Sequence, residues 1–371
     1  MCEFFIYLDN IIFSLQKAGG ISVYWIELTQ RLVDSTNRLV IFENGTIKND
    51  INKRLINHLS IRRERKLFPG KIKRYLPLQA RLEEPSVFHS SYYRISNQRN
   101  VANIVTAYDF IYERFRRGLP KLLHSWQKRF ALRRADGIIC ISESTKMDLL
   151  HWFPELRKKN IRVIYLGVSE AFQALSDTHV DDGKIKEILS TKYIVFVGAR
   201  TAAYKNFDIA VDVVGKLADY KLLIVGGGEL SSNELSKLKE KLSGRYWHYP
   251  GIDETLLNIF YNNAICLLYP SSCEGFGIPI IEAMSSGCPV VAMNVTSIPE
   301  TCGHAGLLVD KPASDNFIKK IRMLENESFR KEIILKGLKR ASRFSWDKCH
   351  NQTKEFYQNV FHEKFGIPLK N

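Results

Sequence analysis

The sequence predicts an α/β protein built from two Rossmann-like domains. Short apolar strands alternate with amphipathic helices along nearly all of its 371 residues, which is the pattern of parallel α/β sheets. The alternation breaks once, at a polar stretch without periodicity from Ser169 to Gly183, and such a stretch is typical of a linker. The length also fits two domains that each bury their own core. We therefore expect one domain over residues 1–168 and another over residues 184–343.

The first half contains apolar runs of strand length, separated by turn residues and helical patterns. The expected strands are residues 4–8, 38–42, 87–89, 103–107, 137–141 and 163–166. A helix over residues 23–32 follows the pair Gly19-Gly20. Because neither glycine carries a Cβ atom, a ligand can approach the backbone closely there.

The second half repeats the same alternation. Its expected strands are residues 193–198, 221–226, 247–249, 264–269, 290–293 and 306–309. Helical patterns lie between them, at residues 206–217, 230–242 and 315–325. Residues 344–361 carry a Ser or Asp cap and a helical stripe, so we expect a final helix there.

The composition is that of a soluble globular protein, with 45% hydrophobic and 25% charged residues. No apolar run approaches the roughly 20 residues that span a bilayer, and the opening run Phe4–Leu8 resembles a strand more than a signal peptide. Seven scattered cysteines form no C-x-x-C pair. We therefore expect reduced thiols in a cytoplasmic protein.

The positive charge is concentrated in one region. Residues 51–134 hold 20 Lys or Arg and 5 Asp or Glu, which accounts for the whole formal net charge of +15. Within it, residues 62–76 mix cations with Leu, Phe, Ile and Tyr. Such a segment can lie against anionic lipid, each cation contributing about 1 kcal/mol. A solvated basic face and a nucleic-acid groove are the alternatives, although no groove-reading motif accompanies the charge.

Two carboxylates eight positions apart form the most informative motif. Glu274 and Glu282 are separated by a glycine turn and by Pro279, which is well placed as the first residue of a helix. The N–H groups of residues 277–280 would then lie at a helix N-terminus, where a diphosphate binds readily. We expect one carboxylate to meet sugar hydroxyls and the other a ribose. The alternative is an ordinary strand–loop–helix junction whose glutamates cap and solubilise it.

The run Glu274-Gly-Phe-Gly-Ile-Pro-Ile-Ile-Glu282 resembles the E-x7-E motif of retaining GT-B glycosyltransferases of glycosyltransferase family 4. The following Ala-Met-Ser-Ser-Gly-Cys-Pro-Val-Val is similar to that family too. The resemblance implies a GT-B architecture of two Rossmann-like domains facing a central cleft, with acceptor in the first and nucleotide-sugar donor in the second. It also implies that the final helix, residues 344–361, packs back on the first domain. Further donor contacts implied by the motif are Gly275, Phe276, Gly277 and Ile278.

Two cations follow the first strand of the second half. Arg200 and Lys205 belong to a loop at the carboxyl end of a strand, where open α/β sheets bind ligands. Fixed cations there would stabilise a leaving diphosphate, and the resemblance implies that both contact the donor phosphates. It also implies that Gly19 and Gly20 approach the diphosphate and that Gly251 and Ile252 border the base.

Acceptor-side candidates lie in the first half. Tyr108 and Asp109 occupy a pair that is often His-Asp in the family, and the tyrosine puts any histidine-specific role in doubt. His89 matches another segment of the family, as a structural or acceptor-lining residue rather than a base. The expected catalytic residues are Arg200, Lys205, Glu274 and Asp109.

The resemblance implies a retaining hexosyltransferase. We expect it to be metal-independent, since no Asp-x-Asp stands in a setting that would bind a catalytic metal. The expected donor is UDP-glucose or a related UDP-hexose, with GDP-mannose as the alternative. The expected acceptor is a glycan or a polyprenyl-diphosphate-linked oligosaccharide of a surface polysaccharide, used at the inner face of the cell membrane. A non-catalytic glycan-binding protein and a nucleic-acid-binding protein remain the alternatives from other classes.

Overall fold

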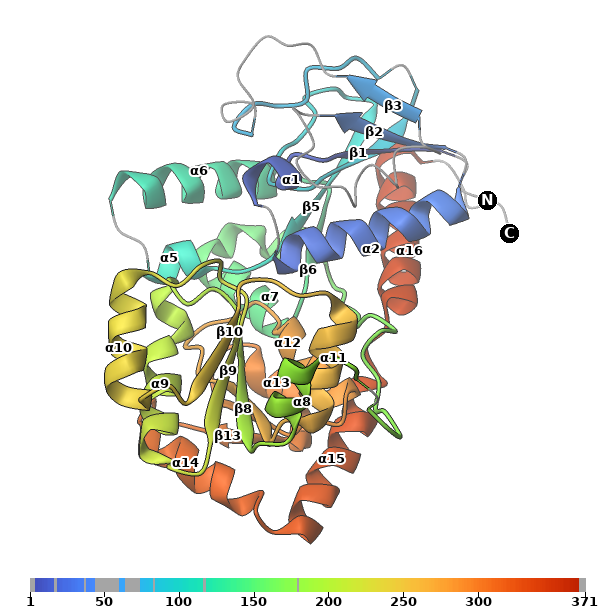
Figure 1. Ribbon diagram of the computed structural model, residues 1–371. Helices are drawn as coiled ribbons and strands as arrows, with labels where there is room; N and C mark the ends of the chain where they lie inside the picture. Colours follow the sequence, from blue (N-terminus) through green and yellow to red (C-terminus); the bar gives the residue numbers. More distant parts are fainter. Residues whose placement is uncertain are drawn as a thin grey trace. The chain divides into compact units, whose positions relative to one another are not determined.

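The protein divides into two compact units, each built on a parallel sheet (Figure 1). The computed structural model describes residues 4–16, 19–36, 38–43, 60–63, 74–82, 84–115, 118–178 and 180–366. The first unit consists of Met1–Gly167 and Trp346–Asn371, and the second of Val168–Ser345. The predicted pair of Rossmann-like domains is confirmed. Among the described residues, no helix combines the length and apolarity needed to cross a bilayer.

The first unit contains a seven-stranded sheet in the order β3-β2-β1-β4-β5-β6-β7. Its strands are β1 (Phe5–Asp9), β2 (Leu39–Glu43), β3 (Ser60–Arg63), β4 (Ser86–Ser90), β5 (Val101–Ala107), β6 (Gly137–Cys140) and β7 (Asn160–Val163). The sequence did not predict β3, and the strand expected at residues 163–166 lies three residues earlier. Both are edge strands, and an edge strand tolerates polar residues that hide its apolar pattern.

Helices cover this sheet, and the last of them comes from the far end of the chain. They are α1 (Ile12–Leu15), α2 (Gly20–Ser35), α5 (Ile111–Phe115), α6 (Leu119–Arg134), α7 (Glu143–Trp152), the 3-10 helix η1 (Pro154–Lys158) and α16 (Trp346–Phe365). Helix α16 packs against α2, β4 and β5. The contact with β6 is so close that a Cβ atom on Gly137 would lie 2.6 Å from Val360 Cγ2.

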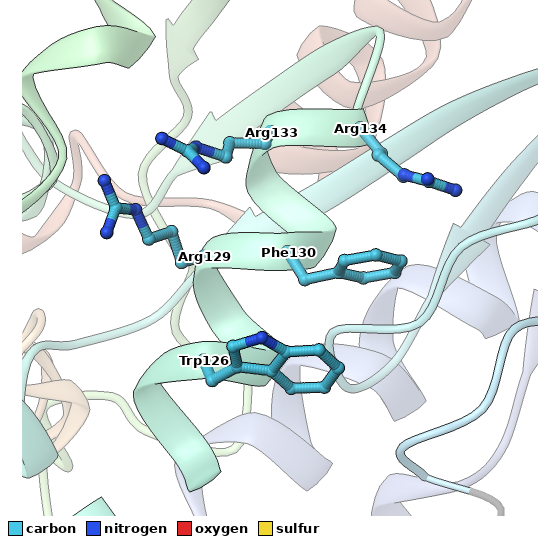
Figure 2. Close-up of a pocket in the computed structure, with 5 residues that line it drawn as sticks. All are labelled: Trp126, Arg129, Phe130, Arg133 and Arg134. Atoms are coloured by element: carbon cyan, nitrogen blue, oxygen red, sulfur yellow. The ribbon is translucent and has the colours of Figure 1, made fainter. Parts of the chain in front are cut away.

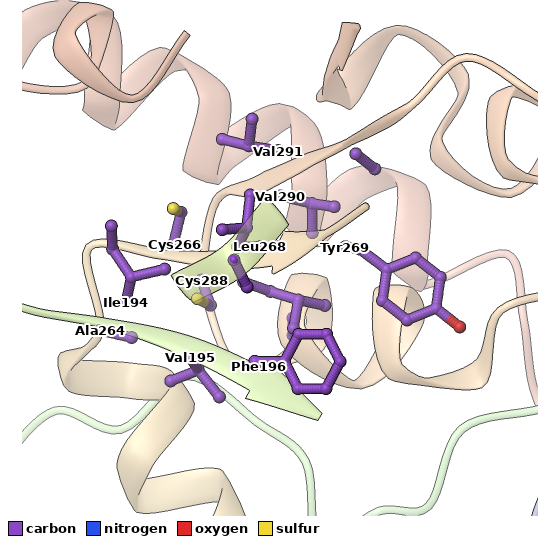
Figure 3. Close-up of a cluster of buried hydrophobic side chains, with 14 of the residues drawn as sticks. Ile194, Val195, Phe196, Ala264, Cys266, Leu268, Tyr269, Cys288, Val290 and Val291 are labelled. Carbon is purple, nitrogen blue, oxygen red and sulfur yellow. The ribbon is translucent and has the colours of Figure 1, made fainter. Parts of the chain in front are cut away.

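The second unit contains a six-stranded parallel sheet in the order β10-β9-β8-β11-β12-β13. Its strands are β8 (Tyr193–Val197), β9 (Lys221–Val225), β10 (Tyr246–Tyr249), β11 (Cys266–Tyr269), β12 (Val290–Met293) and β13 (Gly306–Val309). The central strands are apolar on both faces and form the core shown in Figure 3, as expected for strands covered by helices on both sides. The chain runs from β8 outward to β10 and then returns to the other side of β8 at β11. Ligands of such sheets bind where the strand order reverses.

The helices of the second unit alternate with these strands. They are α8 (Gly183–Leu189), the 3-10 helix η2 (Ala203–Lys205), α9 (Phe207–Lys216), α10 (Ser232–Leu242), α11 (Glu254–Asn263), α12 (Ile278–Ser285), α13 (Ile298–Cys302), the 3-10 helix η3 (Gly303–Ala305), α14 (Ser314–Met323) and α15 (Glu327–Ala341).

The segment expected to be a linker belongs to the second unit. Phe172 is buried in its core, and the N–H groups of Gln173 and Leu175 donate to the side-chain oxygens of Asn258 and Asn262, at 3.1 and 2.8 Å. The expectation of a linker is therefore corrected. Asparagine side chains on α11, rather than a neighbouring strand, accept hydrogen bonds from backbone N–H groups of this segment, and the segment therefore lacks the periodicity of a strand.

Candidate active site

Two loops meet where the strand order of the second unit reverses. One follows β8 and the other follows β11. The N–H of Ser272 donates to Tyr204 O at 2.7 Å, and Asn206 Nδ2 donates to Pro270 O at 2.8 Å and to Ser272 Oγ at 2.6 Å. Asn206 has a φ of 50°, a left-handed conformation that asparagine tolerates well. These bonds hold the two loops together.

Lys205 and Glu274 form an ion pair at this junction. Lys205 Nζ lies 2.6 Å from Glu274 Oε1 and 3.3 Å from the Tyr269 hydroxyl. The two side chains are only 12% and 11% exposed. Burial and the neighbouring Glu274 raise the pKa of the Tyr269 hydroxyl, which therefore stays protonated at neutral pH. The structure thus brings together two residues that the sequence predicted for the site, and it adds Tyr269.

The loop after β12 fixes the backbone of Glu274. The N–H of Glu274 donates to Thr296 Oγ1 at 3.0 Å, and the Ser297 hydroxyl donates to Glu274 O at 2.9 Å. Thr296 has a φ of 49°, which is unusual for a β-branched residue and marks a site held by its surroundings. The sequence reasoning missed Thr296 and Ser297. Their position just after an apolar strand, at the same edge of the sheet, was the available signal.

Helix α12 begins beside this ion pair, one residue earlier than predicted. Gly277 caps the helix with a φ of 100°, which only glycine adopts readily, and Pro279 is the second helical residue rather than the first. Pro279 has no N–H, and the N–H of Ile280 already donates to Gly277 O at 3.0 Å. Of the three N–H groups in residues 277–280, those of Gly277 and Ile278 therefore remain as candidates to bind an anion. Phe276, within the preceding loop, is buried.

Arg200 makes its contacts with the turn after β9. Its side chain is fully buried, and its Nε lies 2.9 Å from Glu234 Oε1. Its Nη atoms donate to the carbonyl oxygens of the turn after β9, those of Gly226, Gly228 and Glu229. These partners occupy the guanidinium, and the expected contact of Arg200 with the donor phosphates stays a prediction. In this structure Arg200 braces the glycine turn.

Glu282 lies one turn into α12, toward α11. The residue as a whole is half-buried, and burial of its carboxyl, followed by the negative charge of Glu254, raises the pKa to about 8, although Tyr261 lowers it in part. The carboxyl is therefore largely protonated at neutral pH and can donate a hydrogen bond. The loop that precedes α11 holds Gly251, which is exposed, and Ile252, which is half-buried.

In the first unit, Gly19 and Gly20 begin α2. Gly19 is the residue before the helix and Gly20 its first residue, and the Ser22 hydroxyl donates to Gly19 O at 2.8 Å. Gly20 is exposed. The N-terminus of this 16-residue helix is thus open to solvent and suits an anion.

Two of the acceptor-side candidates are buried. His89 Nδ1 lies 2.6 Å from the Tyr357 hydroxyl and Nε2 lies 2.8 Å from Thr106 Oγ1, and burial lowers the pKa of the imidazole to about 3. The Tyr108 hydroxyl accepts from Trp25 Nε1 at 2.6 Å. Core partners satisfy both side chains, so His89 has the structural role that was one of its two expected roles, and an acceptor contact at Tyr108 stays a prediction.

Asp109 differs from these two residues. It is half-buried, and its Oδ1 accepts from the N–H of Ile111 at 3.0 Å. Asp109 therefore helps to begin α5, and its side chain is partly accessible.

A buried ion pair that the sequence reasoning missed lies where the strand order of the first unit reverses. Asp9 Oδ2 and Arg94 Nη1 are 3.2 Å apart and neither side chain is exposed. Asp9 also accepts from the Ser90 hydroxyl at 2.8 Å and from the Ser91 N–H and hydroxyl at 2.9 and 2.6 Å. No local sequence motif indicates that these residues pair, because they meet only when β1 and β4 pair.

Two expectations are not tested by this geometry. Among the described residues, no three His, Cys, Asp or Glu side chains gather to hold a metal ion, and metal independence stays a prediction. Most of the basic segment 62–76 lies outside the described residues. Arg62, at its start, is exposed on β3.

Comparison with known proteins matches both halves of the chain. Residues 181–340 match the family described as "Glycosyl transferases group 1", and residues 18–172 match "Glycosyltransferase Family 4". The O-antigen chain mannosyltransferase B of Escherichia coli is 39% identical over 38% of this chain and 37% of its own length. An uncharacterized glycosyltransferase of Methanocaldococcus jannaschii is 30% identical over 62% of each chain. The matched regions thus span less than two thirds of these relatives.

Solved structures share the fold over nearly the whole chain. A sucrose-phosphate synthase from Thermosynechococcus elongatus superposes with a TM-score of 0.76 at 20% identity, covering 97% of this chain and 100% of its own. HepE of Anabaena, in complex with UDP and glucose, gives a TM-score of 0.71 at 15% identity over 96% and 100%. Each half of the chain is thus similar to a family of glycosyltransferases, and the chain shares its fold of two parallel-sheet Rossmann-like units with glycosyltransferases of GT-B architecture.

Proposed function

We propose that this protein transfers a hexosyl group from a nucleoside diphosphate hexose to a glycan acceptor during polysaccharide synthesis, with retention of the anomeric configuration. The observation that carries the proposal is the Lys205–Glu274 ion pair, 2.6 Å long and nearly buried. It lies at the carboxyl ends of β8 and β11, where sheets of this order bind nucleotides, and beside the N-terminus of α12.

Lys205 supplies the charge that the reaction needs. As the glycosidic bond breaks, negative charge develops on the departing diphosphate, and a fixed cation stabilises that charge. Glu274 and the Tyr269 hydroxyl already hold Lys205 Nζ, so little reorganisation is required in the transition state. A site of low exposure also strengthens the electrostatic interaction. The N-terminal end of α12 adds a second positive potential.

Glu274 acts as an orienting and electrostatic group rather than as a nucleophile. Lys205 already engages one carboxylate oxygen of Glu274, and the bonds from Thr296 and to Ser297 fix its backbone. Its other oxygen can accept from a sugar hydroxyl. Retention then requires attack on the same face from which the diphosphate departs, with the departing phosphate receiving the proton of the acceptor hydroxyl.

Glu282 recognises the ribose in this proposal. A carboxyl group with a pKa of about 8 is mostly protonated at pH 7, and it can donate one hydrogen bond to a ribose hydroxyl while accepting another. Gly251 and Ile252 lie in the loop before α11, whose Glu254 raises that pKa. We place the base of the nucleotide beside this loop.

Two nucleotide sugars are candidates for the donor. UDP-glucose or another UDP-hexose is the donor that the sequence predicts, and HepE of Anabaena binds UDP-glucose. GDP-mannose is the second candidate, favoured by the 39% identity to the O-antigen chain mannosyltransferase B and by the match to mannosyltransferase WbdA. The proposed acceptor is a glycan, free or linked to a polyprenyl diphosphate.

The test measures binding first and transfer second. Thermal shifts with UDP, GDP, ADP and their hexose conjugates, without added metal, should show stabilisation by one nucleotide class. The proton NMR spectrum of the product should then show the anomeric configuration of the donor. Lys205→Met should lower kcat for transfer by about 10²–10³-fold, whereas Lys216→Met should leave it unchanged. Lys216 ends α9 in an exposed pair with Asp315 and serves as the matched control. Stabilisation by no nucleotide would refute the proposal.

A further inference from the structure

Up to Lys128, helix α6 has the opposite polarity from an ordinary surface helix, whereas the rest of the helix buries Ala131 and Leu132 in the usual way. Its inward side chains include His124, Gln127 and Lys128, which are 4%, 3% and 0% exposed. Its outward side chains include Leu122 and Trp126, which are 65% and 58% exposed. A surface helix normally directs its apolar stripe to the core. The exposed apolar side chains of the first half of α6, Leu122, Leu123 and Trp126, therefore serve something other than the core.

A buried ion pair fixes this orientation. Lys128 Nζ lies 2.8 Å from Glu113 Oε2 and donates to Asp109 O at 2.8 Å. Rotating the apolar stripe inward would break both contacts and leave the carboxylate of Glu113 buried without its cation, which is strongly unfavourable. The exposed face of α6 is thus built into the fold.

The same face combines aromatic and cationic groups. Trp126, Phe130 and Arg134 stack along the helix, with ring centroids 5.5 Å apart and the guanidinium 4.6 Å from the Phe130 ring. With Arg129 and Arg133 they line a shallow pocket of about 320 Å³. Figure 2 shows the two rings and Arg134 extending to one side of the helix and Arg129 and Arg133 to the other.

The charge of this surface is of one sign. Helix α6 carries five Lys or Arg and no Asp or Glu. Glu155, on η1, is shared by Arg129 and Arg133 at 2.8 and 2.9 Å, so a positive excess remains. The residues that follow, Arg157 and Lys158, are exposed as well. A second copy of this face would meet like charges, which disfavours self-association.

We propose that α6 is an interfacial helix that binds this protein to an anionic phospholipid bilayer. Leu122, Leu123 and Trp126 enter the boundary between headgroups and acyl chains, and the arginines of the same helix contact lipid phosphates. Exposed leucine and tryptophan beside cations is the combination that interfacial helices use, and each cation near an anionic surface adds to the attraction. This surface belongs to the first unit and the Lys205–Glu274 pair to the second, and a binding assay requires no turnover, so its test does not depend on the proposed activity.

The experiment is co-sedimentation of the full chain with vesicles, either pure phosphatidylcholine or a mixture with phosphatidylglycerol. The wild type should bind the anionic vesicles more strongly, and added salt should weaken the binding. Leu122→Ser should lower the partition coefficient by about tenfold or more, as expected for an exposed leucine that becomes buried in lipid. Leu335→Ser is the matched control, because Leu335 is 67% exposed on α15, and it should bind as the wild type does.

Three outcomes would overturn the proposal. The first is equal binding by Leu122→Ser and the wild type. The second is a loss of binding only when Arg62 and its basic neighbours are neutralised, which would place the lipid contact elsewhere. The third is that the wild type does not bind vesicles and is a dimer, whereas Leu122→Ser is a monomer. That result would make the face an interface between copies. An unchanged unfolding temperature shows that the variant is folded.

Discussion

Neutralising Lys205 and Glu274 one at a time and then together tests the candidate site most sharply. Their ion pair is 2.6 Å long, and the two side chains are 12% and 11% exposed. Breaking a fully buried pair costs about 3–5 kcal/mol, because one charge stays buried without its partner. The small remaining exposure reduces this figure. We therefore expect Lys205→Met and Glu274→Gln each to lower the free energy of unfolding by about 2–3 kcal/mol.

In the double variant, stability should be largely restored but activity should not. With both charges removed, no charge is left unpaired, and we expect the double variant to lie within about 1–2 kcal/mol of the wild type. The coupling energy between the two sites is then about 3 kcal/mol. Turnover should not recover, because Lys205 supplies the charge that stabilises the diphosphate. We expect the single variant at Lys205 and the double variant to lose about 10²–10³-fold in kcat.

Scanning calorimetry is the suitable assay, since a protein of two units need not unfold in one step. A change of 1 kcal/mol shifts the Tm of a unit of this size by about 2–4 °C. Each single variant should therefore lower the second unit's Tm by about 5–10 °C, and the double variant by less than either. Additive losses, with a coupling energy below about 0.5 kcal/mol, would show that the two side chains do not pair in solution. Recovery of turnover by the double variant would refute the role given to Lys205.

Four other predictions concern three side chains and the expected independence from metal. Glu282 has a pKa of about 8 when folded against an ordinary 4.5, so the folded protein holds a proton that the unfolded chain releases, and stability falls as pH rises between these values. Glu282→Gln should remove that fall, raising the Tm over wild type more at pH 8.5 than at pH 5, whereas Glu282→Ala should weaken nucleotide binding. Arg200→Lys should lower the Tm nearly as much as Arg200→Ala, because lysine cannot bond several carbonyl oxygens at once; full rescue by lysine would contradict the bracing role. Tyr357→Phe should remove the bond to His89 and cost about 1 kcal/mol in urea unfolding, without changing donor affinity. Finally, EDTA should leave turnover unchanged, and inhibition reversed by Mg²⁺ would show a metal requirement.

Much of the fold could be predicted because its signals are local. The apolar runs of the second unit, such as residues 221–226 and 290–293, predicted β9 and β12 to within a residue. The strands that were missed or displaced, β3 and β7, lie at edges of the first sheet, where pairing on one side makes a polar residue such as Arg162 acceptable. Edge strands therefore lack the continuous apolar run on which the prediction depended.

The site was predicted only as far as local spacing allows. Arg200 and Lys205 stand five positions apart in one loop, and nothing in that spacing tells which cation turns toward the glycine turn after β9. The choice depends on Glu234, which lies 34 positions further along the chain and pairs with Arg200. His89 presents the same difficulty, since its partner Tyr357 is 268 positions away. Such partners are set by tertiary packing, which a single sequence does not display.

The close contact between α16 and β6 has a consequence for the order of folding during synthesis. The second unit is continuous in sequence, from Val168 to Ser345, whereas the first unit needs α16, which leaves the ribosome after all of the second unit. Domains usually fold in the order in which they are made. Here the first unit is made first, but it cannot complete its folding until α16 emerges. Until then Gly137 and His89 stay uncovered. A stop codon placed before Trp346 would therefore damage the first unit, although it lies just after the second.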